Sequence, residues 1–224
     1  MHHEFEDDDG NLIALEVDPA SEDDGAVASA AGLVLTREVL QLRRPLPLGR
    51  TSTITFRRFR PGIDDAEFLR VNNLAFAWHP DQSGWTNAVL SGRMAEPWFD
   101  PDGFLIGDEA GTMLAFCWTK VHPATDDEPR LGEIYVIGVD PAAHGRGLGT
   151  EIVVAGLEHL ASLGIGVGML HVEADNTAAR RMYEGLGFHV HSSHQWWALP
   201  GASARIAAPT ATSADSTDAD VTAP

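Results

Sequence analysis

The sequence predicts an α/β protein. Between residues 53 and 199, short apolar and β-branched runs typical of strands alternate with stretches whose apolar residues recur at helical spacing. The hydrophobic fraction of 44% is that of a globular protein with a packed core. A chain of 224 residues can hold one domain of about 150 residues and a smaller piece.

The expected elements follow one another in a regular order. Thr53–Phe59 is predicted as a strand, and Asp64–Phe76 and Trp85–Met94 as helices separated by a loop. The other predicted elements are strands at Gly103–Gly107, Thr112–Val121, Gly132–Val139 and Val167–Glu173, helices at Leu148–Leu163 and Asn176–Leu186, and a strand pair at Phe188–His191 and His194–Leu199.

Composition excludes several classes of function. A formal charge of −18 argues against a nucleic-acid partner, because phosphate binding needs clustered Lys and Arg. The single cysteine, Cys117, lies in an apolar run and is expected to be a packed strand residue rather than a nucleophile. There is no long apolar run and the start of the chain is acidic, so we expect no signal peptide, no membrane partner and a cytoplasmic monomer.

The most specific segment joins a strand to a glycine-rich turn over Ile134–Thr150. Gly147 and Gly149 stand at the start of the next predicted helix, where glycine lets backbone N–H groups close around an anion. The helix N-terminus adds a partial positive charge and Arg146 adds a cation, so the favoured ligand is a diphosphate. Taken alone, Gly-x-Gly is also typical of a tight turn, and neither the dinucleotide nor the Walker pattern is matched.

A second motif follows over Glu173–Phe188. Asn176 can cap a helix, Ala179 is small enough for close approach of a ligand, and Tyr183 lies two turns after Asn176 on the same helix face. Taken alone, this pattern equally describes a capped helix with a core tyrosine. The two segments together resemble the GNAT acetyltransferase family, through Val-x-Pro-x-x-(Gln/Arg)-x-x-Gly-x-Gly and Asn-x-x-Ala-x-x-x-Tyr-x-x-x-Gly-Phe. His144 replaces the usual Gln or Arg.

This resemblance implies a GNAT fold, with a mixed, mostly antiparallel central sheet flanked by helices. It also implies acetyl-CoA as co-substrate and no metal. The residues expected to bind acetyl-CoA are Ile137, Gly138, Val139, His144, Gly145, Arg146, Gly147, Leu148, Gly149, Thr150, Asn176, Thr177, Ala178, Ala179, Arg180 and Arg181.

Acetyl transfer to an amine needs a neutral amine, a stabilised oxyanion and a proton for the departing thiolate. The resemblance assigns the last role to Tyr183 and an oxyanion contact to the backbone N–H of Val139. Glu133 is the candidate base. It lies an even number of positions before Val139, so both side chains share a face if the strand carries no bulge. A solvated strand-end carboxylate is the alternative for Glu133.

A narrower resemblance, to the mycothiol synthase branch of the GNAT family, rests on four segments. They are Val71–Trp85, Trp98–Gly103, Phe116–Pro123 and Gly132–Pro141. Members of this branch have tandem GNAT domains, of which the C-terminal one acetylates the cysteinyl amine of a small thiol-bearing sugar, Cys-GlcN-Ins.

The narrower resemblance implies substrate contacts at Asp81, Lys120, Glu133 and His171, the last standing where a tyrosine is expected. Without it, Asp81 and Lys120 would be interpreted as ordinary surface charges.

The N-terminal residues repeat the end of the main domain. Leu12–Val17 aligns with Val167–Val172 at an offset of 155 residues, and Val34–Arg44 aligns with the final strand pair. Chance similarity between two amphipathic fragments is the alternative. We expect residues 1–44 to be the remnant of a degenerate GNAT-like domain that lacks its front half, 45–52 a linker, 53–200 the catalytic domain and 201–224 a disordered tail.

Two other functions stay open from the sequence. The chain could acetylate another small amine or a peptide N-terminus, or it could be a truncated homologue that binds acyl-CoA without catalysis. The missing front half is expected to reflect either a misplaced start or a true shortening.

Overall fold

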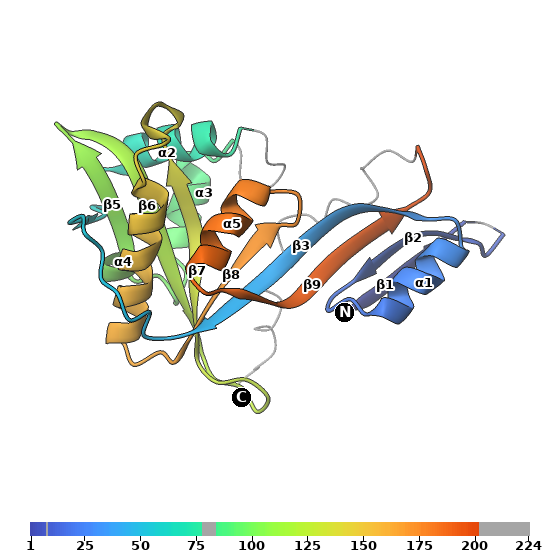
Figure 1. The fold of residues 1–224 in the computed structure, drawn as a ribbon. Helices are drawn as coiled ribbons and strands as arrows, with labels where there is room; N and C mark the ends of the chain where they lie inside the picture. The colour runs from blue at the N-terminus through green and yellow to red at the C-terminus, as the bar shows by residue number, and fades with distance from the viewer. Residues whose placement is uncertain (8, 78–83, 202–224) are drawn as a thin grey trace, which may run out of the picture. The chain divides into compact units, whose positions relative to one another are not determined.

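The computed structural model describes residues 1–7, 9–77 and 84–201 (Figure 1). They form two compact units. The larger unit comprises Gln41–Val172 and Asn176–His191, and the smaller comprises Met1–Leu40, Glu173–Asp175 and the described residues from Ser192 onward. Strands β3 (Val34–Pro45) and β9 (His189–Ala198) contribute residues to both units, so each unit is described by itself.

The larger unit is built on a mixed sheet. Its strands neighbour one another in the order β9, β3, β8, β7, β6, β5, β4. The pairs from β4 to β7 are antiparallel, and β7 and β8 are parallel. The bounds are Arg57–Arg58 for β4, Phe104–Glu109 for β5, Thr112–His122 for β6, Leu131–Val139 for β7 and Val167–Glu173 for β8. The predicted fold class is therefore confirmed for this unit.

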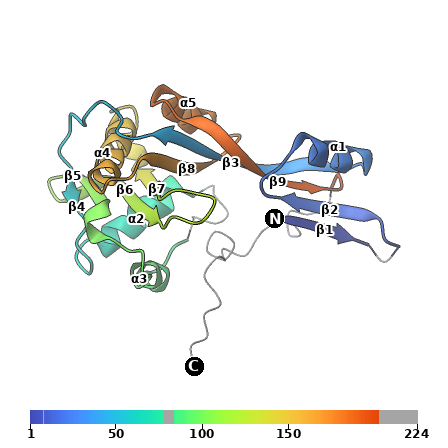
Figure 2. The ribbon, with the colours of Figure 1, turned by 90° about the horizontal axis from the view of Figure 1, so that it is seen from below.

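Helices cover both faces of this sheet. A Cβ on Gly156 of α4 (Leu148–Ser162) would meet Cys117 and Ile134, whereas Gly138 of β7 faces Ala75 of α2 (Asp65–Ala75). Figure 2 shows α4 and α2 on opposite sides of the strands. The other helices here are α3 (Asn87–Met94), α5 (Thr177–Gly185) and the 3-10 turns η1 (Pro101–Gly103) and η2 (Pro141–Ala143). Across the described ranges, every helix is too short or too polar to cross a bilayer.

Aromatic rings form the core between α2 and the sheet. Phe68 of α2 is fully buried, and its ring meets Phe116 edge-on at 4.8 Å and Phe104 at 5.2 Å. Trp118 stacks on Phe104 at 4.5 Å between ring centroids. Burial of such large rings, with edge and stacked contacts adding to it, holds α2 against β5 and β6.

Two predicted elements differ from the observed ones. The strand expected at Thr53–Phe59 is reduced to β4, because the amides of Ser52 and Thr53 donate to the carboxylates of Glu158 and Glu151 on α4 instead of to a strand. The strand pair expected at the end of the chain is one continuous strand, β9, with no glycine or proline inside it to break the extended backbone.

In the smaller unit the strand order is β1, β2, β9, β3, with β1 at His2–Glu6 and β2 at Leu12–Val17. Strand β1 was not predicted. Helix α1 (Glu22–Ala30) begins with a capping box in which Ser21 and Asp24 satisfy each other's backbone N–H groups. The core of the smaller unit consists of Leu15, Val17, Ala28 and Leu33.

The element bounds follow the internal repeat. Elements β2, α1 and β3 begin at Leu12, Glu22 and Val34, and each start lies 155 residues before that of β8, α5 and β9. Both helices carry a polar N-cap, Ser21 in one and Asn176 in the other. The origin of the N-terminal residues in a second GNAT-like domain stays a prediction, and the expected tail over 201–224 lies outside the described residues apart from Gly201.

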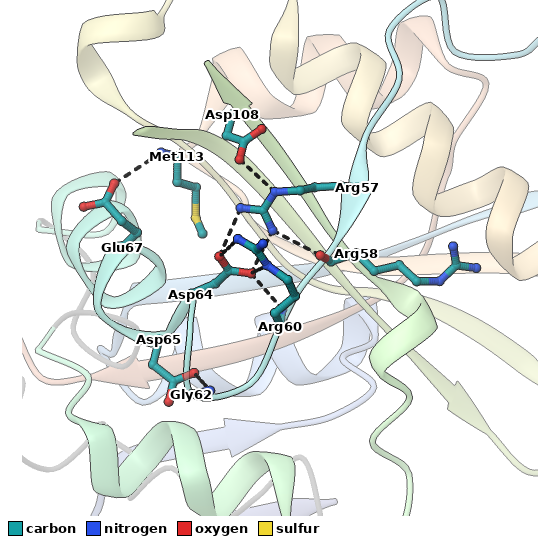
Figure 3. A network of polar contacts seen from close by, with 9 residues as sticks. All are labelled: Arg57, Arg58, Arg60, Gly62, Asp64, Asp65, Glu67, Asp108 and Met113. Carbon is teal, nitrogen blue, oxygen red and sulfur yellow. Dashed lines mark hydrogen bonds and ion pairs between the residues drawn. The ribbon is translucent and has the colours of Figure 1, made fainter. Parts of the chain in front are cut away.

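A buried ion-pair network fixes the entry to α2 (Figure 3). Asp64, with 5% of its surface exposed, accepts hydrogen bonds from both guanidinium nitrogens of Arg57 at 2.7 and 3.1 Å, and from Arg60. Arg57 also donates to Asp108 on β5 at 2.7 Å. Burial alone would raise the pKa of Asp64, but the hydrogen bonds from Arg60 and Arg57 outweigh it and lower this pKa.

We therefore expect Asp64→Asn to destabilise the protein by about 3 kcal/mol at pH 7, because two arginines lose a buried partner. A carboxylate whose pKa is lowered on folding contributes stability above its unfolded pKa. The difference in free energy of unfolding between wild-type protein and Asp64→Asn should therefore be complete above about pH 4 and become smaller as the pH falls further. Urea unfolding of wild-type protein and Asp64→Asn at several pH values measures this difference.

Asp102→Asn is the matched control. Asp102 pairs with Arg58 at the surface, where both side chains are largely exposed, and its loss should cost about 0.5 kcal/mol or less. Equal costs for the two variants would contradict the structural role of Asp64.

Candidate active site

Strands β7 and β8 separate soon after they begin. Their parallel pairing covers only Leu131–Glu133 against Val167–Met169. Further along β7, the N–H of Asp140 donates to the carbonyl of Leu114 on β6 at 2.8 Å. Because successive residues of a strand direct their N–H groups to opposite edges, the N–H groups of Ile137 and Val139 point away from β6, towards the side where β8 has diverged. An extended chain can pair with this edge.

The glycine-rich turn lies at the end of β7. Gly147 is the N-cap of α4 in the left-handed conformation, with φ of 76°, and no side chain caps this helix. The hydrogen bond from Glu151 N–H to Gly147 C=O, 3.2 Å long, closes the first turn, so the preceding amides have no partner inside the helix. A Cβ at Gly147 would meet no atom within 4 Å. Open space beside unpaired amides fits a diphosphate.

Two side chains of the turn were expected to contact acetyl-CoA. The Arg146 guanidinium pairs with Glu109 at the end of β5, and both side chains are exposed. Exposed pairs of this kind contribute about 0–1 kcal/mol, so a phosphate can displace Glu109. The His144 ring lies 3.3 Å from the Val139 carbonyl.

Helix α5 packs beside the start of α4, with Met182 in contact. Asn176 Oδ1 accepts a hydrogen bond from the Ala179 N–H at 3.1 Å, so the predicted cap is confirmed. A Cβ at Gly149 would lie 3.6 Å from both Met182 of α5 and Val139 of β7. The expected cofactor-binding residues from Asn176 to Arg181 therefore form the cap and first turns of a helix that adjoins the glycine-rich turn.

Tyr183 packs under α5. Its side chain is buried, with 5% exposed, and its ring meets Phe188 at 5.9 Å between centroids. Burial raises the pKa of Tyr183, and the nearby Cys117 thiol adds to the shift, so the phenol is protonated at neutral pH. Cys117 is itself fully buried, and burial raises its pKa to about 12, which makes it a poor nucleophile.

A β-bulge in β7 changes the direction of Glu133. The register pairs Trp118 with Val136 and Thr119 with Ile134, so Tyr135 is the extra residue. A bulge reverses the alternation of side chains. Glu133 and Val139 were expected to share a face only in a strand without a bulge, and this condition is not met. Glu133 points to the α2 face of the sheet, whereas Val139 points to the face that carries α4.

Glu133 is held between two histidines. Its side chain is 9% exposed, and its oxygens lie 2.8 Å from His122 Nε2 and 3.0 Å from His171 Nδ1. Burial would raise the pKa of Glu133, but the hydrogen bonds from the two imidazoles outweigh it and lower this pKa. The carboxylate is thus charged at neutral pH and accepts both hydrogen bonds. His171, predicted as a substrate contact, bonds to the candidate base in this structure.

Lys120 lies directly opposite Glu133 in the antiparallel register, on the same face. Its ammonium is 4.7 Å from the centre of the Trp98 ring and 5.7 Å from that of Tyr135, within cation–π range. Lys120, Glu133 and His171 are therefore brought together, as expected. Asp81 lies outside the described residues.

Sequence reasoning missed His122, Gln41 and Arg43. His122 follows Lys120 by two positions on the same strand, and this period was a signal that the two side chains share a face. Gln41 Nε2 lies 3.3 Å from His171 Nε2, and Arg43 Nε donates to Gln41 Oε1 at 2.7 Å. These two residues belong to β3, whose place beside β8 has no signal in the local sequence.

Comparison with known proteins agrees with this geometry. The family model described as "Acetyltransferase (GNAT) family" matches residues 71–188. A GCN5-related N-acetyltransferase of Sphaerobacter thermophilus, a solved structure, has a TM-score of 0.60 with 23% sequence identity, covering 79% of this chain and 56% of that one.

Curated relatives are closer in sequence. A protein of Rhodococcus erythropolis named mycothiol acetyltransferase is 50% identical over 170 residues, which is 72% of this chain and 57% of the relative. One of Mycolicibacterium gilvum with the same name is 47% identical over 192 residues, 81% of this chain and 59% of the relative. The chain thus spans less than two thirds of the length of these relatives. With its sheet, its glycine-rich turn and the match over residues 71–188, the chain belongs to the GNAT acetyltransferase family.

Proposed function

We propose that this chain transfers the acetyl group of acetyl-CoA to the cysteinyl amine of desacetylmycothiol, Cys-GlcN-Ins, and so forms mycothiol. The observation that carries acetyl-CoA binding is the unpaired edge of β7 at Ile137–Val139, which leads to the uncapped N-terminus of α4 at Gly147. When bound, acetyl-CoA supplies the acyl group as a thioester.

Different groups of the chain are suited to different parts of acetyl-CoA. The backbone of Ile137 and Val139 is suited to pair with the amide-containing arm of acetyl-CoA, as an added strand would. The amides at Gly145–Thr150 and the Arg146 guanidinium are suited to the diphosphate. Helix α5 contacts this turn through Met182, and its cap and first turns, from Asn176 to Arg181, are proposed to bind the same ligand.

Two groups are suited to the chemistry of the donor. The N–H of Val139 points to the open edge, where it can donate to the thioester oxygen; a single donor of this kind contributes about 3 kcal/mol to lowering the barrier. The neutral phenol of Tyr183 can protonate the departing sulfur, because its raised pKa keeps the proton available at neutral pH.

The acceptor side is assigned from the relatives and from the α2 face. The relatives are named mycothiol acetyltransferase, and this supports a thiol-bearing sugar as acceptor. Lys120, Glu133 and His171 share this face and offer one cation, one anion and one imidazole. Such groups suit a substrate with an amine and several hydroxyls. Asp81 is proposed as a fourth contact from the resemblance alone.

Loss of the Glu133 carboxylate or of the Tyr183 hydroxyl should impair turnover with acetyl-CoA and Cys-GlcN-Ins. We expect Glu133→Ala to lower kcat/KM by about 100-fold or more, and Tyr183→Phe to lower kcat by about 10- to 100-fold with unchanged acetyl-CoA affinity. Steady-state kinetics and calorimetric titration with acetyl-CoA measure the two effects. Cys117→Ala is the control and should retain activity, since its thiol is buried. Full activity of both Glu133→Ala and Tyr183→Phe contradicts the assigned roles.

The acceptor class has its own test. We expect wild-type protein to acetylate Cys-GlcN-Ins at least about 100-fold more efficiently, as kcat/KM, than simple amines or peptide N-termini, because buried polar groups reject acceptors that leave them unpaired. Mass spectrometry of the products over a panel of acceptors measures this ratio. Equal turnover of simple amines would identify a general amine acetyltransferase, and binding of acetyl-CoA without any product would identify a non-catalytic binder.

Gly147→Ala tests the diphosphate site. The added methyl group projects into the open space beside the α4 amides, so we expect the Kd for acetyl-CoA to rise by about 10-fold or more through steric exclusion of the phosphate. Gly164→Ala is the matched control, because Gly164 has a φ of 75° and equally open surroundings at the other end of α4. Both should lose about 1 kcal/mol of stability, and equal acetyl-CoA affinity in the two variants contradicts the site.

A further inference from the structure

A row of polar side chains crosses four neighbouring strands on the α2 face of the larger unit. It starts at His122 on β6, passes through Glu133 on β7 and His171 on β8, and ends on β3 with Gln41 and Arg43. Each member is within hydrogen-bond distance of the next. The row is therefore a connected network, in which the direction of each hydrogen bond constrains its neighbours.

The donor and acceptor of every hydrogen bond in the row can be assigned by starting from Arg43, at the β3 end. Arg43 is held by Glu128 in a two-pronged pair at 2.8 and 2.9 Å, and it can only donate. Its bond to Gln41 therefore requires the amide oxygen on that side, which turns the amide NH₂ towards His171 Nε2. His171 Nε2 must accept this hydrogen, so the ring carries its proton on Nδ1 and donates it to Glu133.

Glu133 is consequently a poor candidate to take a proton. Each of its oxygens already accepts a hydrogen bond from an imidazole, its side chain is 9% exposed, and its pKa is lowered. A base works best when its pKa lies near the operating pH, and imidazole is the side chain that meets this condition near neutrality.

His122 differs from Glu133 in having a nitrogen that accepts no hydrogen bond among the described residues and a more accessible side chain. Its Nε2 faces the charged Glu133 carboxylate at 2.8 Å and must therefore be the N–H nitrogen. In its neutral form the lone pair lies on Nδ1. Within the described ranges of the chain, Glu133 is the one hydrogen-bonding partner of this ring. The His122 side chain is also more accessible than that of Glu133, at 29% against 9%.

We propose that His122 Nδ1 accepts the proton of the substrate amine and that Glu133 is a positioning residue, which holds the His122 ring in the tautomer that presents this nitrogen. The inference deepens the proposed function and rests on it. As the amine nitrogen bonds to the acetyl carbon and the carbon–sulfur bond breaks, one proton passes from nitrogen to His122 and one from the Tyr183 hydroxyl to sulfur. Solvent then returns a proton to Tyr183 and removes the one on His122.

Among the described residues, charged and titratable groups lie along the row that contains His122 and next to it. They are Lys120 on β6, Glu133 on β7, His171 on β8, Arg43 on β3, Glu128 in the loop between β6 and β7, and His191 on β9, whose ring lies 4.0 Å from Glu128. Arg43 and Glu128 neutralise each other. The Glu133 charge therefore faces two imidazoles and Lys120.

Nitrogen-15 NMR of the histidine rings tests the tautomers without any turnover. In wild-type protein at a pH where the rings are neutral, we expect the His122 proton on Nε2 and the His171 proton on Nδ1, each identified from its ring couplings after assignment with His122→Gln and His171→Gln. In Glu133→Ala the His122 ring should lose this single tautomer and show a mixture. A His122 proton on Nδ1 in wild-type protein overturns the proposal.

Kinetics with acetyl-CoA and Cys-GlcN-Ins test the proton transfer. We expect His122→Ala to lower kcat by about 100-fold or more with unchanged acetyl-CoA affinity, and added imidazole to restore part of the loss. His159→Gln is the matched control: its Nε2 lies 3.1 Å from the Asp100 carboxylate, its side chain is 12% exposed, and it lies on α4 away from the row. It should keep wild-type activity.

The two proposals fail in distinguishable ways. Wild-type activity in His122→Ala, or no rescue by imidazole, overturns the role of His122 while the acetyltransferase function stands. Wild-type protein that acetylates other amines but not Cys-GlcN-Ins overturns the proposed substrate; the same His122→Ala loss and rescue, measured with the amine that is turned over, would still support His122 as the base.

Discussion

The site depends on one constraint: within the part of the chain that the structure describes, the pairing of β7 with β8 ends at Glu133. Backbone N–H and C=O groups inside a sheet are normally paired, and an unpaired stretch is a template for another extended chain. Here the stretch at Ile137–Val139 leads directly to Gly147, whose conformation begins α4 without a capping side chain. The same departure from regular pairing thus provides both a strand-like contact and an anion site for one long ligand.

The bulge at Tyr135 divides the site between the two faces of the sheet. Beyond the bulge, Val139 turns towards α4, α5 and the buried phenol of Tyr183, which are the groups suited to the acyl donor. Before the bulge, Glu133 turns to the other face, where Lys120 and the two histidines gather. The groups proposed for the acyl donor and those proposed for the acceptor therefore lie on opposite faces of the same strand.

Several elements of the candidate site could be predicted from the sequence, because each is determined by residues close together in the chain. Strand β8, the cap at Asn176 and the glycine-rich turn follow from hydrophobic period, side-chain chemistry and backbone freedom within a few residues. The bulge was not accessible, because an extra residue in β7 is defined by its register against β6. The contribution of Gln41 was also missed, since it depends on a strand far away in the chain pairing next to β8. The pairing of Arg146 with Glu109 is a long-range contact of the same kind.

The position of β3 limits how the acetyltransferase can be isolated. The larger unit starts at Gln41, and its β3 residues lie next to β8, so they belong to the unit that carries the candidate site although they precede the region matched by the family model. A fragment severed just before residue 53 would expose the flank of β8 and deprive the His171 ring of its amide neighbour. Excision, grafting or fusion of the larger unit therefore has to retain a strand that its recognisable motifs do not include.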